Sequence, residues 1–488
     1  MNNKWLELSL LLGLVLTVAL VSSMPIYTEA ILRRMLVKDL ENYQKSSGVY
    51  PATHRTTVFL TKSGEQNSAD ASSTDAFMES VKTDFSLPVR LAVIARATDT
   101  FTFAPVDSTR IDPSVTRRAE IAAISDLTDH VTLVDGKLPA KEPVDGVYEA
   151  VVVENALTKL NMVLGNEFVI ADERAKEPLV IRPVGVINPK DERDLYWFNP
   201  LESYGNTFFI DYDLFERDIT SAKKGVVRSS TWYFAFDYSK MDLRAMADFV
   251  RTHERIDQFI SARFESKSIR APALNIFPAY AEREQKLRLM LWSLNVPVMI
   301  MLGFYLLMVS NLIVERQKTE IAVLRSRGAS RLQVLLSYVI EGTLLGGISF
   351  LVGPPVGMLF TKLLGSSNGF LEFVQRAALH AELNGTAYKY SLFAVLFSLV
   401  MTLIPTWSAT RASIVGHKQQ MARMHKTPFW HKYGIDVVLL GVSFYGLQSF
   451  RRRMDDLTAF GLDSADFKVD PLLFFVPALF TLGAGMVA

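Results

Sequence analysis

Apolar runs of bilayer length divide the chain into membrane and non-membrane parts. Residues 291–314 contain no charged side chain, and at 1.5 Å per residue such a helix exceeds the roughly 30 Å of a bilayer core. Residues 332–361, interrupted only by Glu341, and residues 390–409 have the same character. We therefore predict three membrane-spanning helices in this part of the chain.

The apolar run at residues 8–21 has two interpretations. A cleaved signal peptide would also show a basic start and a short apolar core. However, apolar side chains continue beyond the run at helical spacing, at Leu32, Leu36, Leu40 and Tyr43. This continuation favours an uncleaved first span within residues 1–30, which leaves the membrane as an amphipathic stalk helix.

Two weaker candidate spans lie within residues 435–488. The first, residues 435–450, is short and contains Asp436, and the second, residues 471–488, is uncharged to the last residue. The simplest interpretation of an apolar stretch at this position is that the sequence is the front part of a longer protein.

Basic residues in the short loops predict the orientation. Residues 315–331 carry five Lys and Arg against two acidic residues, and residues 410–432 carry five with no acid. Both loops therefore belong to the cytoplasm. The balanced loop 365–389 then lies outside, as does the segment from about residue 30 to 286, and the N-terminus is cytoplasmic. Arg451, Arg452 and Arg453 would contradict this scheme if residues 435–450 span the membrane.

The outside segment has the pattern of a mixed α/β domain. β-branched and aromatic runs predict strands at residues 89–103, 147–153, 167–170, 179–187 and 231–236. A helix is predicted around residues 243–250, with Ser239 or Asp242 as its start signal. Residues 63–74, rich in Ser, Asp and Asn, predict a mobile loop. Residues 280–289 predict a charged helix continuous with the second span.

Together these patterns predict an α-helical multi-pass membrane protein, with a large mixed α/β extracytoplasmic domain between the first and second spans. The expected order is a first span at 1–30, stalks and outer domain at 31–286, and a membrane core at 287–410. A basic cytoplasmic linker at 411–434 and the two candidate spans at 435–488 follow.

Composition removes several function classes. A net charge of +1 gives no positive electrostatic field that would attract nucleic acid. The chain has no Cys, which excludes disulfides, thiolate zinc sites and cysteine nucleophiles. Phosphate-loop, serine-elbow and His-Glu-x-x-His motifs are absent from the sequence, and the seven His are scattered. We expect no catalytic residue, no metal site and no enzymatic activity.

The loop at residues 315–331 carries the first candidate mechanism. Ile321 and Leu324 lie one helical turn apart among charged residues, Gly328 occupies a helix-stop position, and Ser330 a new start. Such a short amphipathic helix can dock into a groove on a cytoplasmic partner. It can also lie on anionic lipid, and the pattern leaves both interpretations open.

The third span carries the second candidate mechanism. Gly342 with Gly346 and Gly353 with Gly357 form two small-xxx-small pairs, and Pro354 and Pro355 lie between the second pair. These residues predict close helix packing or a kink. Glu341 is an intramembrane carboxyl, which is either functional or engaged in a structural interhelical hydrogen bond.

These residues resemble a known family. The segment ERQKTEIAVLRSRGASR at residues 315–331, followed by Glu341 and the glycines, resembles the FtsX-like permeases of ABC transporters. In the outer segment, residues 151–157, 164–168 and 184–187 are similar to the small β-rich part of MacB- and LolC-type periplasmic domains. The two resemblances cover most of the chain up to about Lys418.

The resemblance implies a permease that binds a separate cytoplasmic ATPase, with ATP and Mg²⁺ in that partner and no cofactor on this chain. ATP-driven dimerisation of the ATPase would move the stalks and outer domain. The residues expected to couple with the ATPase are Glu315, Glu320, Ile321, Leu324, Arg325, Arg327 and Gly328. Spans near Leu8, Leu291, Leu332 and Tyr390 would form the four-span module, and the later spans fit members with two modules in one chain. Membrane lipids, an extracytoplasmic protein and a second module are further expected partners.

Three classes of function remain at this point. The resemblance implies export or extraction of a lipid, lipoprotein, peptide or amphiphile, and its alternative is a subunit that relays ATP hydrolysis to an outer partner such as a cell-wall hydrolase. A membrane sensor would need a cytoplasmic signalling region larger than the short loop between the second and third spans. A membrane-anchored hydrolase would need the catalytic motifs that the sequence lacks.

Overall fold

The computed structural model describes residues 4–60, 64–107, 111–112, 114–171, 179–221, 227–366, 382–411 and 434–460, with Val476, Leu479, Phe480 and Gly483. The chain divides into two compact units, residues 36–280 and residues 1–35 with 281–488. The basic linker, most of the loop 365–389 and most of the last candidate span lie outside the described residues.

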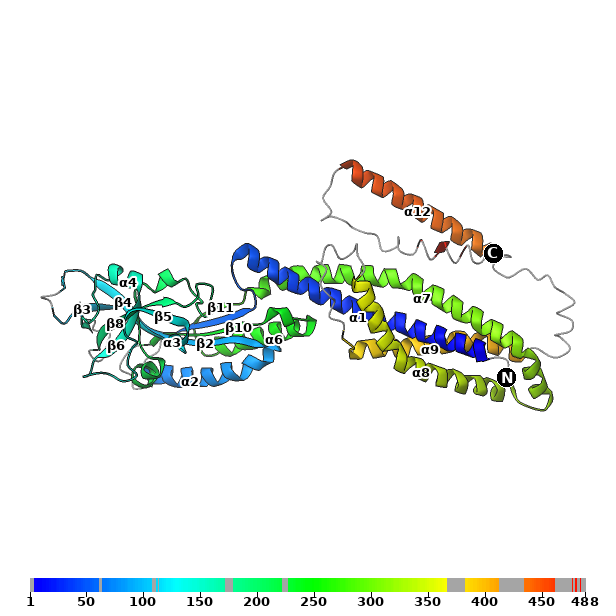
Figure 1. Ribbon diagram of the computed structural model, residues 1–488, viewed down its shortest axis with the longest axis horizontal. Helices are drawn as coiled ribbons and strands as arrows, with labels where there is room; N and C mark the ends of the chain where they lie inside the picture. The colour runs from blue at the N-terminus through cyan, green and yellow to red at the C-terminus, as the bar shows by residue number, and fades with distance from the viewer. Residues whose placement is uncertain are drawn as a thin grey trace. The chain divides into compact units, whose positions relative to one another are not determined.

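The unit of residues 36–280 begins with a four-stranded antiparallel sheet covered by two helices (Figure 1). Its strands are β1 (Thr53–Phe59), β2 (Val89–Thr98), β10 (Val227–Phe236) and β11 (Ser266–Arg270), in the spatial order β11-β1-β10-β2. Helix α2 (Gly64–Val81) connects β1 to β2, and α6 (Leu243–Ser261) connects β10 to β11. This order and connection make a split βαβ arrangement of the ferredoxin-like kind.

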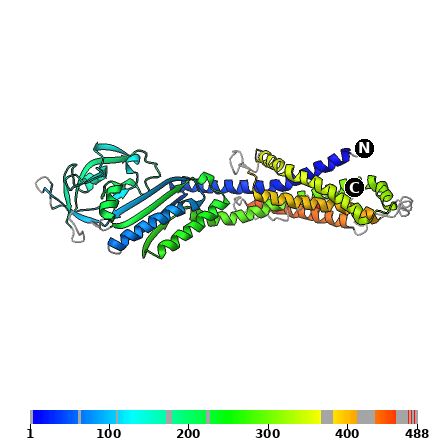
Figure 2. The ribbon, with the colours of Figure 1, turned by 90° about the horizontal axis from the view of Figure 1, so that it is seen from below.

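Both helices lie on one face of this sheet (Figure 2). Phe77 of α2 stacks on Phe259 of α6 at 3.6 Å between ring centroids. The α2 carboxylate of Asp75 accepts a hydrogen bond from Trp232 of β10 at 2.7 Å. Because side chains alternate along a strand, residues with the opposite parity to Trp232 face away from the helices.

A closed β-barrel lies between β2 and β10 in the sequence. Six strands close it in the order β4-β3-β7-β8-β6-β9 and back to β4. Strand β5 pairs with β8 outside this ring, and β4 also pairs with β2 of the open sheet. The bounds are β3 (Phe101–Pro105), β4 (Arg117–Ile124), β5 (Val131–Gly136), β6 (Tyr148–Val153), β7 (Phe168–Ile170), β8 (Val180–Pro189) and β9 (Thr207–Phe209).

Short helices complete this unit. They are η1 (Lys82–Phe85), α3 (Leu127–His130), α4 (Glu154–Lys159), η2 (Leu201–Tyr204), α5 (Tyr212–Phe215), η3 (Glu216–Ser221) and η4 (Tyr238–Lys240). The N-cap of α6 is Asp242, whose side chain accepts the Ala245 N–H at 2.7 Å. Of the two predicted start signals, Asp242 is therefore the one used, and Ser239 lies in η4.

The predicted mobile loop at residues 63–74 is wrong, because α2 begins at Gly64 and continues to Val81. The end of this helix is held by tertiary contacts that its composition does not show. Met78 and Val81 are buried, and Asp75 binds both Trp232 and the buried Arg96. Packing of this kind overrides a weak local preference for helix.

The other unit contains long apolar helices. Helix α1 (Lys4–Ser47) begins there, α7 (Ala273–Ser326) ends there, and α8 (Arg331–Ser366) and α9 (Gly385–Arg411) follow. Four segments of the described residues are long and apolar enough to cross a membrane: Glu7–Ser47, Val298–Lys318, Arg331–Leu363 and Gly385–Trp407. Helix α7 continues beyond its apolar segment at both ends, and the 41-residue segment of α1 is longer than a bilayer core requires, as the predicted stalk pattern implies.

Helix α12 (Ile435–Phe460) contains the candidate span at residues 435–450. Its apolar part, Val437–Ser449, has the length of a buried or interfacial segment. At 1.5 Å per residue this part covers about 20 Å, short of the roughly 30 Å bilayer core.

Candidate functional site

The turn between α7 and α8 forms the first candidate site. Gly328 adopts a φ of +98°, in the left-handed region that glycine enters without a steric penalty. Its N–H donates to the Arg325 carbonyl at 3.1 Å, and the Ala329 N–H donates to the Leu324 carbonyl at 3.1 Å. This pair of hydrogen bonds is a Schellman motif, which ends α7 at the predicted stop signal.

Helix α8 then starts with a capping box. The Ser330 hydroxyl accepts the Gln333 N–H at 3.2 Å, and the Gln333 side chain accepts the Ser330 N–H at 2.9 Å. Between these two signals, only the four residues 327–330 separate the two long helices. The predicted coupling helix is therefore the end of α7 and not a separate element.

Helices α7 and α8 form a helical hairpin, and on one side of it their side chains pack against each other. Ile321 is 4% exposed and lies in a cluster with Val314, Val334 and Ala409. The Tyr338 hydroxyl of α8 donates to Gln317 Oε1 of α7 at 2.5 Å. Ile321, predicted to couple with the ATPase, is therefore placed inside the hairpin, where its side chain joins α7 to α8.

The opposite side is open. Leu324 is 51% exposed and Val323 is 45% exposed, although both side chains are apolar. Of the other predicted coupling residues, Glu315, Glu320, Arg327 and Gly328 are exposed, and Arg325 is half-buried. Sequence reasoning missed Val323, which adjoins Leu324, and it missed the bond between Gln317 and Tyr338, which joins residues on different helices.

The glycines of α8 line two helix contacts. A Cβ atom on Gly346 would lie 2.8 Å from Val395 of α9, and one on Gly342 would lie 3.5 Å from Leu399. Farther along α8, a Cβ on Gly357 would lie 2.5 Å from the Ala19 carbonyl oxygen of α1. The predicted small-residue stripe therefore permits close approach to α9 in its first half and to α1 in its second half.

Helix α1 meets this stripe with small and polar residues. Gly353 lies against Val18, and Ser22 and Ser23 are buried beside Gly357. The Thr361 hydroxyl of α8 donates to the Ser23 carbonyl of α1 at 3.4 Å. In the same unit, Asn384, just before α9, donates a hydrogen bond to Glu29 of α1. These contacts fix α1 to α8 and α9 through backbone proximity.

Glu341 is half-buried in α8. Glu7, near the start of α1, is close enough to repel its carboxylate. Among the described residues no hydrogen bond to the Glu341 side chain is found. The interhelical hydrogen bond considered as one alternative is therefore not found among the described residues.

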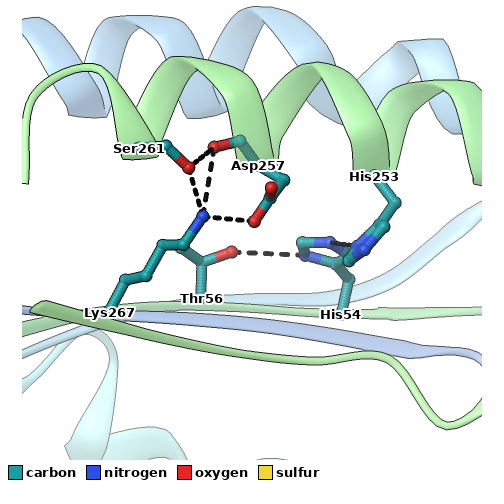
Figure 3. Close-up of polar contacts among 6 residues, drawn as sticks. All are labelled: His54, Thr56, His253, Asp257, Ser261 and Lys267. Atoms are coloured by element: carbon teal, nitrogen blue, oxygen red, sulfur yellow. Dashed lines mark hydrogen bonds and ion pairs between the residues drawn. The ribbon is translucent and has the colours of Figure 1, made fainter.

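In the unit of residues 36–280, the face of the four-stranded sheet that α2 and α6 cover holds a polar cluster (Figure 3). His54 of β1 is fully buried, and its Nε2 lies 3.2 Å from Nδ1 of His253 on α6. Burial, with a smaller contribution from His253, lowers the pKa of His54 to about 3. Nearby, Lys267 pairs with Asp257 at 2.5 Å. Within the described residues, no group of three or more His, Asp or Glu could hold a metal ion.

A buried arginine joins α2, the sheet and η3. Arg96 donates two hydrogen bonds to Asp75, at 2.7 and 2.8 Å, and lies 3.0 Å from Glu216. Its guanidinium also lies over the Trp232 ring, 5.1 Å from the centroid. Two carboxylates around one fully buried guanidinium form a structural network, which the mixed sequence pattern of β2 did not indicate.

The family comparison concerns the unit of residues 1–35 and 281–488, which we call the membrane unit. Residues 293–414 match the family model described as FtsX-like permease C-terminal. This chain therefore contains an FtsX-like permease C-terminal domain. The matched segment contains the α7–α8 turn, the glycines of α8 and helix α9, and it confirms the resemblance inferred from residues 315–331. No curated protein matches the chain.

FtsX-like permeases are membrane subunits of ABC transporters, and their ATPase is generally a separate cytoplasmic chain. The match, together with the apolar helices, indicates that this chain is a membrane protein. The similarity of the outer unit to MacB- and LolC-type domains, and the second permease module, stay predictions.

Proposed function

We propose that this FtsX-like permease couples ATP hydrolysis in a cytoplasmic ATPase subunit to movement of the extracytoplasmic domain. The coupled work would be export or extraction of a lipid, lipoprotein, peptide or amphiphile. The supporting observation is the exposed apolar face of Val323 and Leu324 at the end of α7. Such a face, bordered by charged residues, is suited to a groove on a protein partner.

The hairpin gives this face a fixed position. The Ile321 cluster packs α7 against α8, and the Schellman motif at Gly328 sets the exit of the chain. A docked ATPase would therefore act on two long helices together. Helix α7 is one element from Ala273 to Ser326, so a displacement at its last turn shifts a rigid helix and not a flexible linker.

The test is capture of the full-length protein with its ATPase subunit after Leu324→Glu. A charge on the docking face has no compensation in an apolar groove, so we expect association to weaken roughly 30-fold, corresponding to about 2 kcal/mol. Membrane insertion should be unchanged, because Leu324 is exposed. Copurification and stimulated ATPase activity are the readouts.

Val163→Glu is the matched control, since Val163 is an exposed apolar residue of the outer unit. This control should retain association. If Leu324→Glu also retains full copurification and ATPase stimulation, the docking role of this face is refuted. A changed dependence on anionic lipid with intact association would instead support the lipid-surface interpretation.

A further inference from the structure

A large cavity opens on the outer unit, within residues 36–280. Its volume is about 1750 Å³, and its lining comes from the end of α1, the open sheet and the segment 188–202. Arg55 and Tyr233 line it from the sheet. They alternate with His54 and Trp232, which face the helices, so the cavity lies on the uncovered face of the sheet.

Two arginines stand side by side on this face. Arg55 of β1 and Arg270 of β11 are direct cross-strand partners. Like charges in this position destabilise a sheet unless something compensates them. Burial and the neighbouring Arg270 charge both lower the pKa of Arg55. The arrangement therefore places two positive charges side by side on this face of the sheet.

Glu41, Glu192, Asp194 and Glu202 line the cavity, and among the described residues none of them forms an ion pair with Arg55 or Arg270. Asp194 is bonded to His130 at 2.6 Å, and Glu41 is paired with Lys45 at 2.6 Å. Arg55 donates to the Phe198 carbonyl at 2.9 Å and to Asn199 Oδ1 at 2.7 Å, both uncharged acceptors. Among the described residues, no hydrogen bond or ion pair engages the Arg270 side chain.

Aromatic side chains line the cavity beside this charge. Phe198 and Tyr233 lie 5.6 Å apart between ring centroids, and the Arg55 guanidinium lies 5.8 Å from the Phe198 ring. Trp197 also lines the cavity.

We propose that this cavity binds an anionic amphiphile, whose phosphate or carboxylate group pairs with Arg55 and Arg270 while its apolar part lies against Trp197, Phe198 and Tyr233. Paired guanidinium groups suit the oxygen atoms of such a head group. Aromatic walls suit an apolar body but not a free inorganic anion. Binding here is independent of ATPase coupling and takes place without nucleotide.

The experiment uses the full chain in phosphatidylcholine nanodiscs, with radiolabelled decyl phosphate in equilibrium dialysis and empty discs as background. Decyl phosphate should bind saturably, and decylphosphocholine and inorganic phosphate should each bind at least about tenfold more weakly. Equal affinity for inorganic phosphate, or for the zwitterion, would overturn the proposal. Competition by phosphatidylglycerol placed in the disc would assign the natural ligand to the bilayer, and lack of competition to a soluble amphiphile.

Arg270→Gln gives the decisive variant, because Arg270 is exposed and removing its charge leaves the fold intact. We expect affinity for decyl phosphate to fall at least about tenfold, with partial recovery in Arg270→Lys. Arg244→Gln is the matched control, since Arg244 is an exposed arginine on α6, which covers the other face of the sheet. Undiminished binding by Arg270→Gln would refute the site, whatever the outcome for ATPase association.

Discussion

His54 and His253 place an ionisable pair inside the outer unit. His54 is packed against Phe85, with ring centroids 5.3 Å apart, and against the imidazole of His253. Burial lowers the pKa of both histidines, and the charge of Lys267 adds to the effect on His253. The folded protein therefore holds His54 neutral, whereas the unfolded chain protonates it near pH 6.5.

This difference makes the outer unit sensitive to acid. A depressed histidine pKa stabilises the fold above pH 6.5, and the contribution is lost as the pH falls from 6.5 toward 3. Between pH 7 and 5 the free energy of unfolding around α6 should fall by about 2 kcal/mol. Hydrogen exchange of α6 in the full-length protein, corrected for intrinsic rates, measures the change.

The variant His54→Phe should reduce this pH dependence, because it removes the titrating group and keeps an aromatic ring against Phe85. An unchanged slope between pH 7 and 5 in the variant would show that other groups cause the acid sensitivity.

The α7–α8 turn shows what residue patterns can and cannot predict. Gly328 and Ser330 were predicted as stop and start signals, because capping depends on local backbone geometry. The sequence spacing placed Ile321 and Leu324 on one apolar face, but Ile321 is buried and Leu324 is exposed. Only the packing of α8 against α7 decides which of these two side chains is buried and which is exposed.

At the scale of elements, α8 depends on small residues at both of its helix contacts. Gly357 lies against the backbone of α1, which has no alternative rotamer to relieve a clash. Gly347 of the same helix has open space around the position of a Cβ atom. On the same helix, Gly357 is therefore tightly packed, whereas Gly347 has room for a larger side chain.

Gly357→Ala should destabilise the membrane unit by about 1 to 3 kcal/mol, because the new methyl group would overlap the Ala19 carbonyl and Ser22. Gly347→Ala should leave stability unchanged or slightly higher, since alanine favours helix over glycine. Thermal unfolding of both variants in the same detergent tests the pair. Equal melting temperatures would contradict close packing of α8 on α1.

Strand prediction succeeded where apolar residues alternate or cluster. Runs at residues 147–153, 167–170, 179–187 and 231–236 correspond to β6, β7, β8 and β10, and the run 89–103 contains both β2 and β3. Strand β1 was missed because its buried positions include His54 and Thr56, which are polar. Its burial follows from pairing with β10 and β11, a non-local fact that one sequence does not contain.

At the scale of the whole molecule, loop charge predicts that the α7–α8 turn is cytoplasmic and the outer unit extracytoplasmic. The chain has no Cys, so a single introduced thiol has no native background. Ser326→Cys lies at the exposed end of α7, and Glu142→Cys lies at an exposed position of the outer unit.

In intact spheroplasts, a membrane-impermeant maleimide should label Glu142→Cys and spare Ser326→Cys, and permeabilisation should make both reactive. The reason is the basic excess of residues 315–331, which predicts that this loop lies on the cytoplasmic side. Labelling of Ser326→Cys before permeabilisation would reverse the proposed orientation and remove the basis for ATPase docking there.

The position of the barrel within the open sheet has a consequence for how this domain can change. Strand β2 ends at Thr98 and β10 begins at Val227, and these two residues are cross-strand partners. The inserted residues therefore leave and return to the sheet at neighbouring points. A barrel of another length or specificity could be grafted there, provided that it keeps the pairing of β4 with β2 and the Glu216 partner of the buried Arg96.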